Sequence, residues 1–174
     1  MTRLPRPSES DIRTESRSVT DPGRDAEATG PCRAVAVSCI DYRFVEPLRR
    51  FFAADQLTGA VDLIAWPGGA AAIATPDREA LVEAIGLACS LHEPAEILLV
   101  AHHDCGRLGG SAYFAGRHAE ITALDTALAM AGETVADRFP TRRVRLVRLD
   151  LDGQPVVVNV SGRDPVAAAA GDRS

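Results

Sequence analysis

Ala34-Val35-Ala36-Val37 and Ile97-Leu98-Leu99-Val100 are short apolar runs that predict two strands buried in a sheet. Polar residues follow each run at the predicted strand end: Cys39-Ile40-Asp41-Tyr42-Arg43 after the first, and His102-His103-Asp104-Cys105-Gly106 after the second. Ligands of open parallel α/β sheets bind at the carboxyl ends of the strands. We therefore expect two thiols, an imidazole and a carboxylate–guanidinium pair to meet in one crevice.

Strands and helices alternate along the rest of the chain. Apolar spacing predicts strands over residues 34–38, 61–66, 96–101, 144–151 and 156–160, and helices over residues 45–54, 75–91 and 117–131. Asp152-Gly153 is a hairpin turn signal between the last two strands. This order predicts an α/β fold, a mainly parallel sheet of about four to five strands flanked by helices, with a C-terminal antiparallel hairpin. Right-handed crossovers then bring the ends of the first and third strands together.

Composition favours one globular domain with a mostly aliphatic core, because 46% of the 174 residues are hydrophobic and 5% are aromatic. Residues 1–31 predict a disordered tail, residues 32–163 a single domain and residues 164–174 a loose C-terminal tail. The net charge of -5 argues against nonspecific nucleic-acid binding. Neither a membrane span nor a signal peptide is recognisable, so we expect a cytoplasmic protein without a membrane partner.

Glycine and proline mark the expected boundaries. Pro67-Gly68-Gly69 ends the second strand and lets the backbone approach another segment closely. Thr75-Pro76-Asp77 predicts a helix start with Thr75 as the N-cap, and Gly132 predicts the end of the helix before it. Glycines 106, 109 and 110 predict a flexible loop after the second motif.

Three further features have structural interpretations. Residues 144–151 alternate Val or Leu with Arg, which predicts a strand with one solvent-exposed face. Cys89 lies on the apolar side of a predicted helix and is interpreted as a small buried hydrophobe. Trp66 is expected in the core or at an interface, and Cys32 is given no role.

Cys39, His102 and Cys105 offer two thiolates and an imidazole, a ligand set that suits zinc. Three protein ligands leave a fourth position for water or substrate, as in catalytic zinc sites. Cys-x-Asp-x-Arg and His-x-x-Cys are weak signals separately, but both at strand ends in one chain are much more specific. The sequence therefore predicts one Zn²⁺ per chain, bound by the domain of residues 32–163.

With these motifs the sequence resembles the beta-class carbonic anhydrases, or a close relative on the same scaffold. The family pattern of Cys-x-Asp-x-Arg and His-x-x-Cys-Gly is matched by residues 39–43 and 102–106. The resemblance implies a zinc-dependent carbonate dehydratase in which Cys39, His102 and Cys105 bind zinc, and Asp41 with Arg43 forms the catalytic dyad. It also implies CO2 and bicarbonate as small-molecule substrates, and a homodimer or higher homo-oligomer.

The residues themselves permit this chemistry. Two thiolates and a neutral imidazole leave a zinc site formally neutral, so bound water is less acidic than in an all-histidine site. Asp41 can accept the proton of that water while Arg43 holds Asp41 by a bidentate contact. The zinc-bound hydroxide then attacks CO2 and gives bicarbonate. The resemblance adds a closed state, in which Asp41 moves onto the metal as fourth ligand.

Alternatives remain for the neighbouring residues. Asp41 and Arg43 could form a purely structural ion pair, and Gly68-Gly69 could either form a turn or line the pocket with backbone. His103 is interpreted as a surface or hydrogen-bonded loop residue, with a proton shuttle as the alternative. Asp104 either orients His102 or caps the following turn.

Departures from the family pattern keep other functions open. Ala65-Trp66-Pro67-Gly68-Gly69 stands where many members carry an Arg-Asn-Ala-Gly-type run, and Tyr42 replaces a small residue. The N-terminal helical arm of the family is not recognisable. The alternatives are a carbonyl sulfide or carbon disulfide hydrolase, a non-catalytic zinc-binding regulatory homologue, and a metal-free cysteine enzyme.

Overall fold

The computed structural model describes residues 30–76, 78–150 and 154–158, which build a five-stranded sheet in the order β2-β1-β3-β4-β5. The strands are β1 (Ala34–Cys39), β2 (Val61–Trp66), β3 (Glu96–His102), β4 (Arg143–Leu149) and β5 (Pro155–Val157). The first four are parallel, and β5 pairs antiparallel with β4. The predicted α/β fold with a mainly parallel sheet and a terminal antiparallel strand pair is confirmed.

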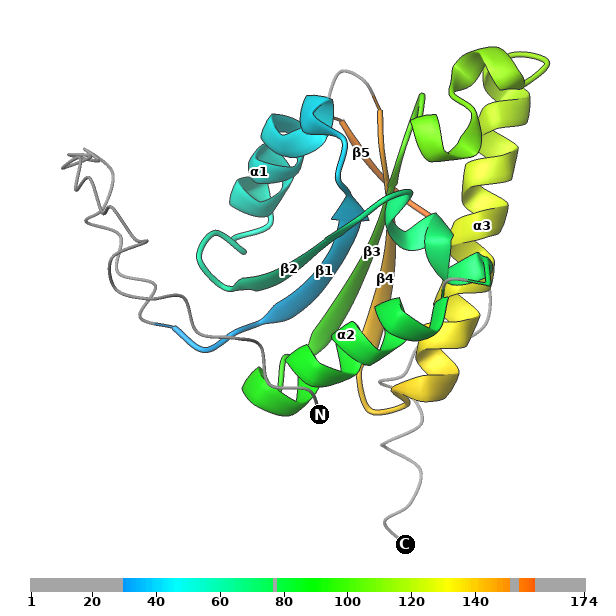
Figure 1. The fold of residues 1–174 in the computed structure, drawn as a ribbon. Coiled ribbons are helices and arrows are strands. Elements are labelled where there is room, and N and C mark those ends of the chain that lie inside the picture. Colours follow the sequence, from blue (N-terminus) through cyan, green and yellow to red (C-terminus); the bar gives the residue numbers. More distant parts are fainter. Residues whose placement is uncertain (1–29, 77, 151–153, 159–174) are drawn as a thin grey trace, which may run out of the picture.

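Helices cover both faces of this sheet. The long helices are α1 (Val45–Ala54), α2 (Arg78–His92) and α3 (Arg117–Arg138), and short 3₁₀ turns are η2 (Tyr42–Phe44), η3 (Gly69–Ala74), η4 (Gly106–Leu108) and η5 (Ser111–Tyr113). Figure 1 shows α1 on one side of the sheet and α2 and α3 on the other. None of the helices in the described residues is long and apolar enough to cross a membrane.

Each face of the sheet has its own apolar core, because successive strand residues point to opposite sides. The larger core joins η3, α2 and α3 to one face, and its fully buried members include Val35, Val37, Ile85, Leu99 and Leu128. The smaller core joins α1 to the other face, and its members include Ala36, Leu48, Phe51, Leu98 and Val147. Cys89 belongs to the larger core and Trp66 packs against it, as the sequence predicts.

β1 and β3 lie side by side with parallel register, from Ala34 opposite Glu96 to Val37 opposite Leu99. Their carboxyl ends therefore fall at the same edge of the sheet. The two polar motifs follow these ends, so the crossovers bring them together as expected.

Helix α3 is longer than predicted, because Gly132 lies inside it rather than at its end. A Cβ at Gly132 would lie 3.0 Å from Cδ2 of Leu146, so this glycine allows α3 to pack closely on β4. The glycine thus serves helix–sheet packing and not helix termination.

Two other predictions are corrected. The loop expected to be flexible after the second motif forms the two 3₁₀ turns η4 and η5, with Gly109 and Gly110 at positive φ between them. The exposed face expected on β4 is incomplete, since Arg148 is 7% exposed and pairs with Asp125 of α3.

Several predictions concern residues outside the described ranges. These are the tail over residues 1–29, the turn at residues 152–153, the end of the last strand and the tail over residues 164–174. Thr75 lies just before the first described residue of α2, Arg78, and its hydroxyl donates to the carbonyl of Ala72 at 2.7 Å.

Candidate functional site

Cys39, His102 and Cys105 come together at the carboxyl edge of the sheet. Their ligand atoms all lie within 4.8 Å of one another, and the two sulfur atoms are 4.0 Å apart. Cys39 ends β1, His102 ends β3, and Cys105 opens the turn η4. His102 and Cys105 are buried and Cys39 is partly buried. The structure thus collects the three residues that the sequence proposes as metal ligands.

His102 is oriented with one ring nitrogen free to bind a metal. Its Nδ1 lies 2.7 Å from the carbonyl oxygen of His103, so this nitrogen carries the proton and donates it. Nε2 is buried and makes no hydrogen bond to any described residue. The ring of Phe44 packs on the imidazole at 3.9 Å between centroids. A buried, unpartnered nitrogen beside two sulfurs fits a metal ion.

The protonation of Cys39 and Cys105 favours a cation between their two sulfur atoms. A hydrogen bond from the Cys105 thiol holds the pKa of Cys39 at about 4, and the backbone N–H of Gly68, 3.4 Å from the Cys39 sulfur, adds to this. The same bond and burial raise the pKa of Cys105. One thiolate is therefore already favoured, and a cation between the sulfurs would favour the second.

Gly69 fixes the distance between the two motifs. Its φ is +55°, and a Cβ there would lie 2.7 Å from the backbone nitrogen of Cys39 and 2.8 Å from the carbonyl oxygen of Val100. The close backbone approach expected of Pro67-Gly68-Gly69 is therefore real, and it occurs between β1 and β3. Gly68 also lines the cavity beside the site, which matches the pocket-lining alternative.

Asp41 and Arg43 form a tight pair beside the ligand group. Arg43 Nη2 lies 2.6 Å from Oδ2 of Asp41, and Nε lies 3.0 Å from Oδ1. Asp41 also caps the turn η2 by accepting the backbone N–H of Arg43 at 3.0 Å. The Arg43 guanidinium lowers the pKa of the Asp41 carboxyl to about 2. The Asp41 carboxylate is thus ionised, and its hydrogen bonds fix its orientation.

Arg43 is held in turn by Asp104. Nη1 donates to Oδ2 of Asp104 at 2.6 Å and Nη2 to its carbonyl oxygen at 2.8 Å. Asp104 has a φ of +54°, and its carboxylate accepts the backbone N–H of Ser111 at 2.8 Å. Asp104 therefore supports Arg43 and the turn after it, whereas the orientation of His102 comes from the carbonyl of His103.

A buried carboxylate of α3 supports Asp104. Glu120 is 3% exposed, and its Oε1 accepts the backbone N–H of Asp104 at 2.6 Å. Its Oε2 accepts the hydroxyl of Ser111 at 2.7 Å. Burial opposes ionisation of Glu120, but these donors hold its pKa below the ordinary value. A chain of contacts thus leads from α3 through Asp104 and Arg43 to Asp41.

His103 is buried, so of the two expected positions, surface or hydrogen-bonded loop, the surface one is wrong. It is 3% exposed, with Nδ1 3.4 Å from Oε2 of Glu120 and Nε2 2.8 Å from Oδ1 of Asp150. Its backbone N–H donates to the carbonyl of Leu149 at 3.1 Å. His103 therefore links β3 to α3 and to the end of β4.

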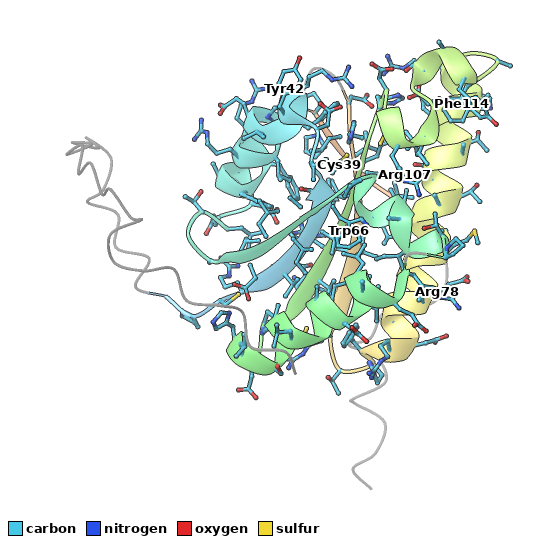
Figure 2. All side chains as sticks on the ribbon, in the orientation of Figure 1. Cys39, Tyr42, Trp66, Arg78, Arg107 and Phe114 are labelled. Atoms are coloured by element: carbon cyan, nitrogen blue, oxygen red, sulfur yellow. The ribbon has the colours of Figure 1, made fainter. Side chains whose placement is uncertain are left out.

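Two cavities meet at Cys39 and Ile40. The first, about 310 Å³, is mainly apolar and reaches His102 between α1 and β2, where Phe44, Leu48, Phe52 and Leu63 line it. The second, about 660 Å³, is lined in part by the charged side chains of Asp41, Arg43 and Arg107. Figure 2 shows Cys39 and Arg107 at the same end of the sheet. Cys39 thus adjoins both a mainly apolar cavity and a cavity with charged side chains in its lining.

Sequence reasoning missed Glu120, Ser111 and Arg107. Glu120 lies on the buried stripe of α3 that continues through Leu124 and Leu128. A carboxylate at the helical spacing of a buried apolar stripe is the signal that could have found it. Ser111 and Arg107 carry no such pattern.

Comparisons with known proteins agree with this arrangement. The family described as "Putative carbonic anhydrase" matches residues 30–136, more than half of the 174 residues. The chain belongs to this family. No curated protein matches the chain.

Members of the carbonic anhydrase fold are found among solved structures. The beta-carbonic anhydrase CafA of the fungal pathogen Aspergillus fumigatus aligns with a TM-score of 0.54 and 14% identity, over 82% of this chain and 83% of that one. A structure from work on two tetrameric beta-carbonic anhydrases of Sordaria macrospora aligns with a TM-score of 0.49 and 18% identity, over 76% and 84%. At such identity the likeness to CafA shows a shared fold.

Proposed function

We propose that this chain is a zinc-dependent carbonic anhydrase that converts CO2 and water reversibly to bicarbonate, with one catalytic zinc ion per chain. One observation carries the proposal: Cys39, which lies within 4.8 Å of the ligand atoms of His102 and Cys105, lines the same cavity as the Asp41–Arg43 pair. Membership of the "Putative carbonic anhydrase" family supports it. A purely structural zinc site would more often have four protein ligands.

Cys39, His102 and Cys105 would hold the metal through two sulfurs and Nε2 of His102. When bound, zinc supplies the acidity that makes a coordinated water a nucleophile near neutral pH. The carboxylate of Asp41 is held by Arg43, which favours the open arrangement over the closed state with Asp41 on the metal. The fourth metal position is then left to solvent or substrate.

Asp41 accepts the proton of the attacking water, and Arg43 positions Asp41 for this. The two hydrogen bonds from Arg43 fix the direction of the Asp41 carboxylate. The proton acceptor is therefore already oriented before each turnover. Asp104 and Glu120 act as positioning residues, because Asp104 accepts hydrogen bonds from Arg43 and Glu120 accepts the backbone N–H of Asp104.

The two cavities suit substrate and product. CO2 is apolar, and the cavity between α1 and β2 leads to His102 past apolar side chains. Bicarbonate is an anion, and the other cavity contains the guanidinium groups of Arg43 and Arg107. We assign CO2 to the first cavity and bicarbonate to the second. The expected homo-oligomer and the cytoplasmic location stay predictions.

Zinc content and stopped-flow CO2 hydration near pH 8.5 test the proposal. The purified chain should hold zinc at Cys39, His102 and Cys105 and hydrate CO2. Asp41→Asn should keep this zinc and lose about 100-fold or more in turnover, because the proton acceptor is gone. Asp137→Asn, on the exposed side of α3, is the matched control and should keep its activity.

Three outcomes would contradict the proposal. Full activity in Asp41→Asn removes Asp41 from the mechanism. Zinc without CO2 hydration, combined with hydrolysis of carbonyl sulfide or carbon disulfide in the same preparation, favours the sulfur substrates. A folded chain that takes up no zinc rejects the metal centre itself.

A further inference from the structure

A second group of metal-ligating side chains lies at the opposite edge of the sheet. Cys32 precedes β1, Asp62 is the second residue of β2, and His92 is the last residue of α2. Their ligand atoms all lie within 4.8 Å of one another, and Nδ1 of His92 is 2.7 Å from Oδ2 of Asp62. β1 spans six residues, so about 20 Å of strand separates this group from the Cys39 group.

The topology explains why these three residues meet. β1 and β2 are parallel, and Asp62 pairs with Val35, three residues after Cys32. α2 leads from β2 back to the start of β3, so its last residue returns to the amino edge of the sheet. Figure 1 shows the end of α2 beside the start of β1. Three segments that are distant in sequence therefore place a sulfur, an oxygen and a nitrogen at one point.

The donors match a borderline divalent cation such as zinc. Thiolate, carboxylate and neutral imidazole are all common zinc ligands, and together they neutralise a double positive charge. The position at the carboxyl end of α2 adds the partial negative charge of the last helical carbonyls. Cys32 and Asp62 are partly buried and His92 is exposed, so an ion can enter from solvent and keep a water as fourth ligand.

The alternative is a simple ion pair between His92 and Asp62, with Cys32 nearby. In that arrangement the Cys32 thiol donates a weak hydrogen bond to the carbonyl of Ala34 at 3.3 Å and still lies within 4.8 Å of the ligand atoms of Asp62 and His92. The ion pair accounts for the contact between Asp62 and His92 but not for the sulfur beside them, whereas a cation would use all three donors.

We infer that Cys32, Asp62 and His92 form a second cation site that binds zinc and ties the segment before β1 to the end of α2. The site goes beyond the proposed activity, since none of its residues reaches either cavity beside Cys39. Zinc bound there stabilises the folded chain, because the unfolded chain does not hold the three ligands together.

Zinc titration of the full-length, metal-stripped chain against a chromophoric chelator tests this inference. Wild type should bind two zinc ions per chain at micromolar free zinc. Cys32→Ser and His92→Gln should each bind one zinc ion. When cobalt replaces zinc, the absorption spectrum of Cys32→Ser should lack the charge-transfer contribution of one thiolate. Cys89→Ala is the control, because it removes a nearby buried thiol that is not part of the group.

The two metal centres fail separately in this experiment. Cys105→Ser should lose the other ion and keep the one at Cys32, so loss of the catalytic centre leaves the inference intact. His92→Gln alters an exposed residue, so its folding is not in doubt. Equal zinc binding by wild type, Cys32→Ser and His92→Gln overturns the second site, whether the wild-type chain binds one zinc ion or two.

Discussion

The two edges of the sheet carry similar donor atoms in different surroundings. At the carboxyl edge, His102 and Cys105 are buried, Nδ1 of His102 is fixed by a carbonyl, and a backbone N–H points at the sulfur of Cys39. At the amino edge, His92 is exposed and one contact of 2.7 Å joins it to Asp62. Donor atoms alone therefore do not distinguish the proposed catalytic centre from the proposed structural one. The supporting contacts do, because they fix the ligands before the metal arrives.

The carboxyl edge also has a second layer that the amino edge lacks. Arg43, Asp104 and Glu120 connect the Cys39 group to α3, with hydrogen bonds of 2.6 Å from Arg43 to Asp104 and from Asp104 to Glu120. The amino edge is instead rich in ion pairs, such as that of Arg145 with Asp55 and Glu96. This difference predicts that changes at the carboxyl edge reduce turnover, whereas changes at the amino edge reduce metal content or stability.

The largest expected difference in CO2 hydration is between variants that remove one cysteine at each edge. Cys105→Ser should lose the catalytic metal and lower CO2 hydration to the uncatalysed background, since a hydroxyl is a poor zinc ligand. Cys32→Ser should lower metal content without abolishing turnover. Metal analysis and stopped-flow assays on both variants check this pair, with Cys89→Ala as the shared control. Equal loss of activity in both cysteine-to-serine variants would erase the distinction between the edges.

Gly69→Ala should have the next largest effect, because its Cβ would clash with backbone atoms at the ends of β1 and β3. The added Cβ meets two backbone atoms within 2.8 Å at a positive φ, so neither a side-chain shift nor relaxed backbone removes the clash. We expect a loss of about 3 kcal/mol or more in the free energy of unfolding, measured by urea denaturation. Gly106→Ala is the control, since its Cβ would meet nothing within 4 Å. Equal stability of the two variants would mean that the strands can separate at Gly69 without cost.

Glu120→Ala tests the second layer of the carboxyl edge. It leaves the backbone N–H of Asp104 unpaired, so Arg43 and Asp41 lose their fixed position. Turnover should fall about 10- to 100-fold while zinc stays bound, a typical cost for losing an outer contact of a metal site. Glu120→Gln should recover most of kcat, because its amide oxygen still accepts that N–H.

Glu133→Gln, exposed on the same helix, is the matched control for Glu120. A merely structural role of Glu120 would lower stability in Glu120→Ala while leaving kcat per folded molecule unchanged. The ratio of kcat to zinc content separates these outcomes.

The sequence was enough to predict the sheet and the meeting of Cys39, His102 and Cys105, for a physical reason. Runs such as Ile97-Leu98-Leu99-Val100 form buried strands wherever they pair, and parallel strands bring Cys39 and His102 to one edge without further information. Glu120 and Cys32 were not predicted, because their partners come from helix packing and carry no fixed spacing in the chain. Gly132 misled the prediction of α3 because packing and termination both favour glycine.

The smallest effect is expected from the ion pairs of the amino edge. The Arg145 guanidinium holds the pKa of Asp55 below its ordinary value, so the folded state favours the ionised carboxylate. The pair therefore stabilises the fold above the unfolded pKa of about 4, and this stability is lost as pH falls through the lower folded pKa. Asp55→Asn should cost about 0.5 kcal/mol at pH 7, because the pair is partly exposed.

Urea midpoints of wild type and Asp55→Asn at pH 7, 4 and 3 measure that contribution. The gap between the two proteins should shrink toward pH 3, and Glu133→Gln should show no such convergence. CO2 hydration by Asp55→Asn should stay close to that of wild type, since Asp55 lies at the end of α1 and outside both cavities. A large loss of turnover with little loss of stability would show that the amino edge is coupled to the catalytic centre, and the separation of roles between the edges would then be wrong.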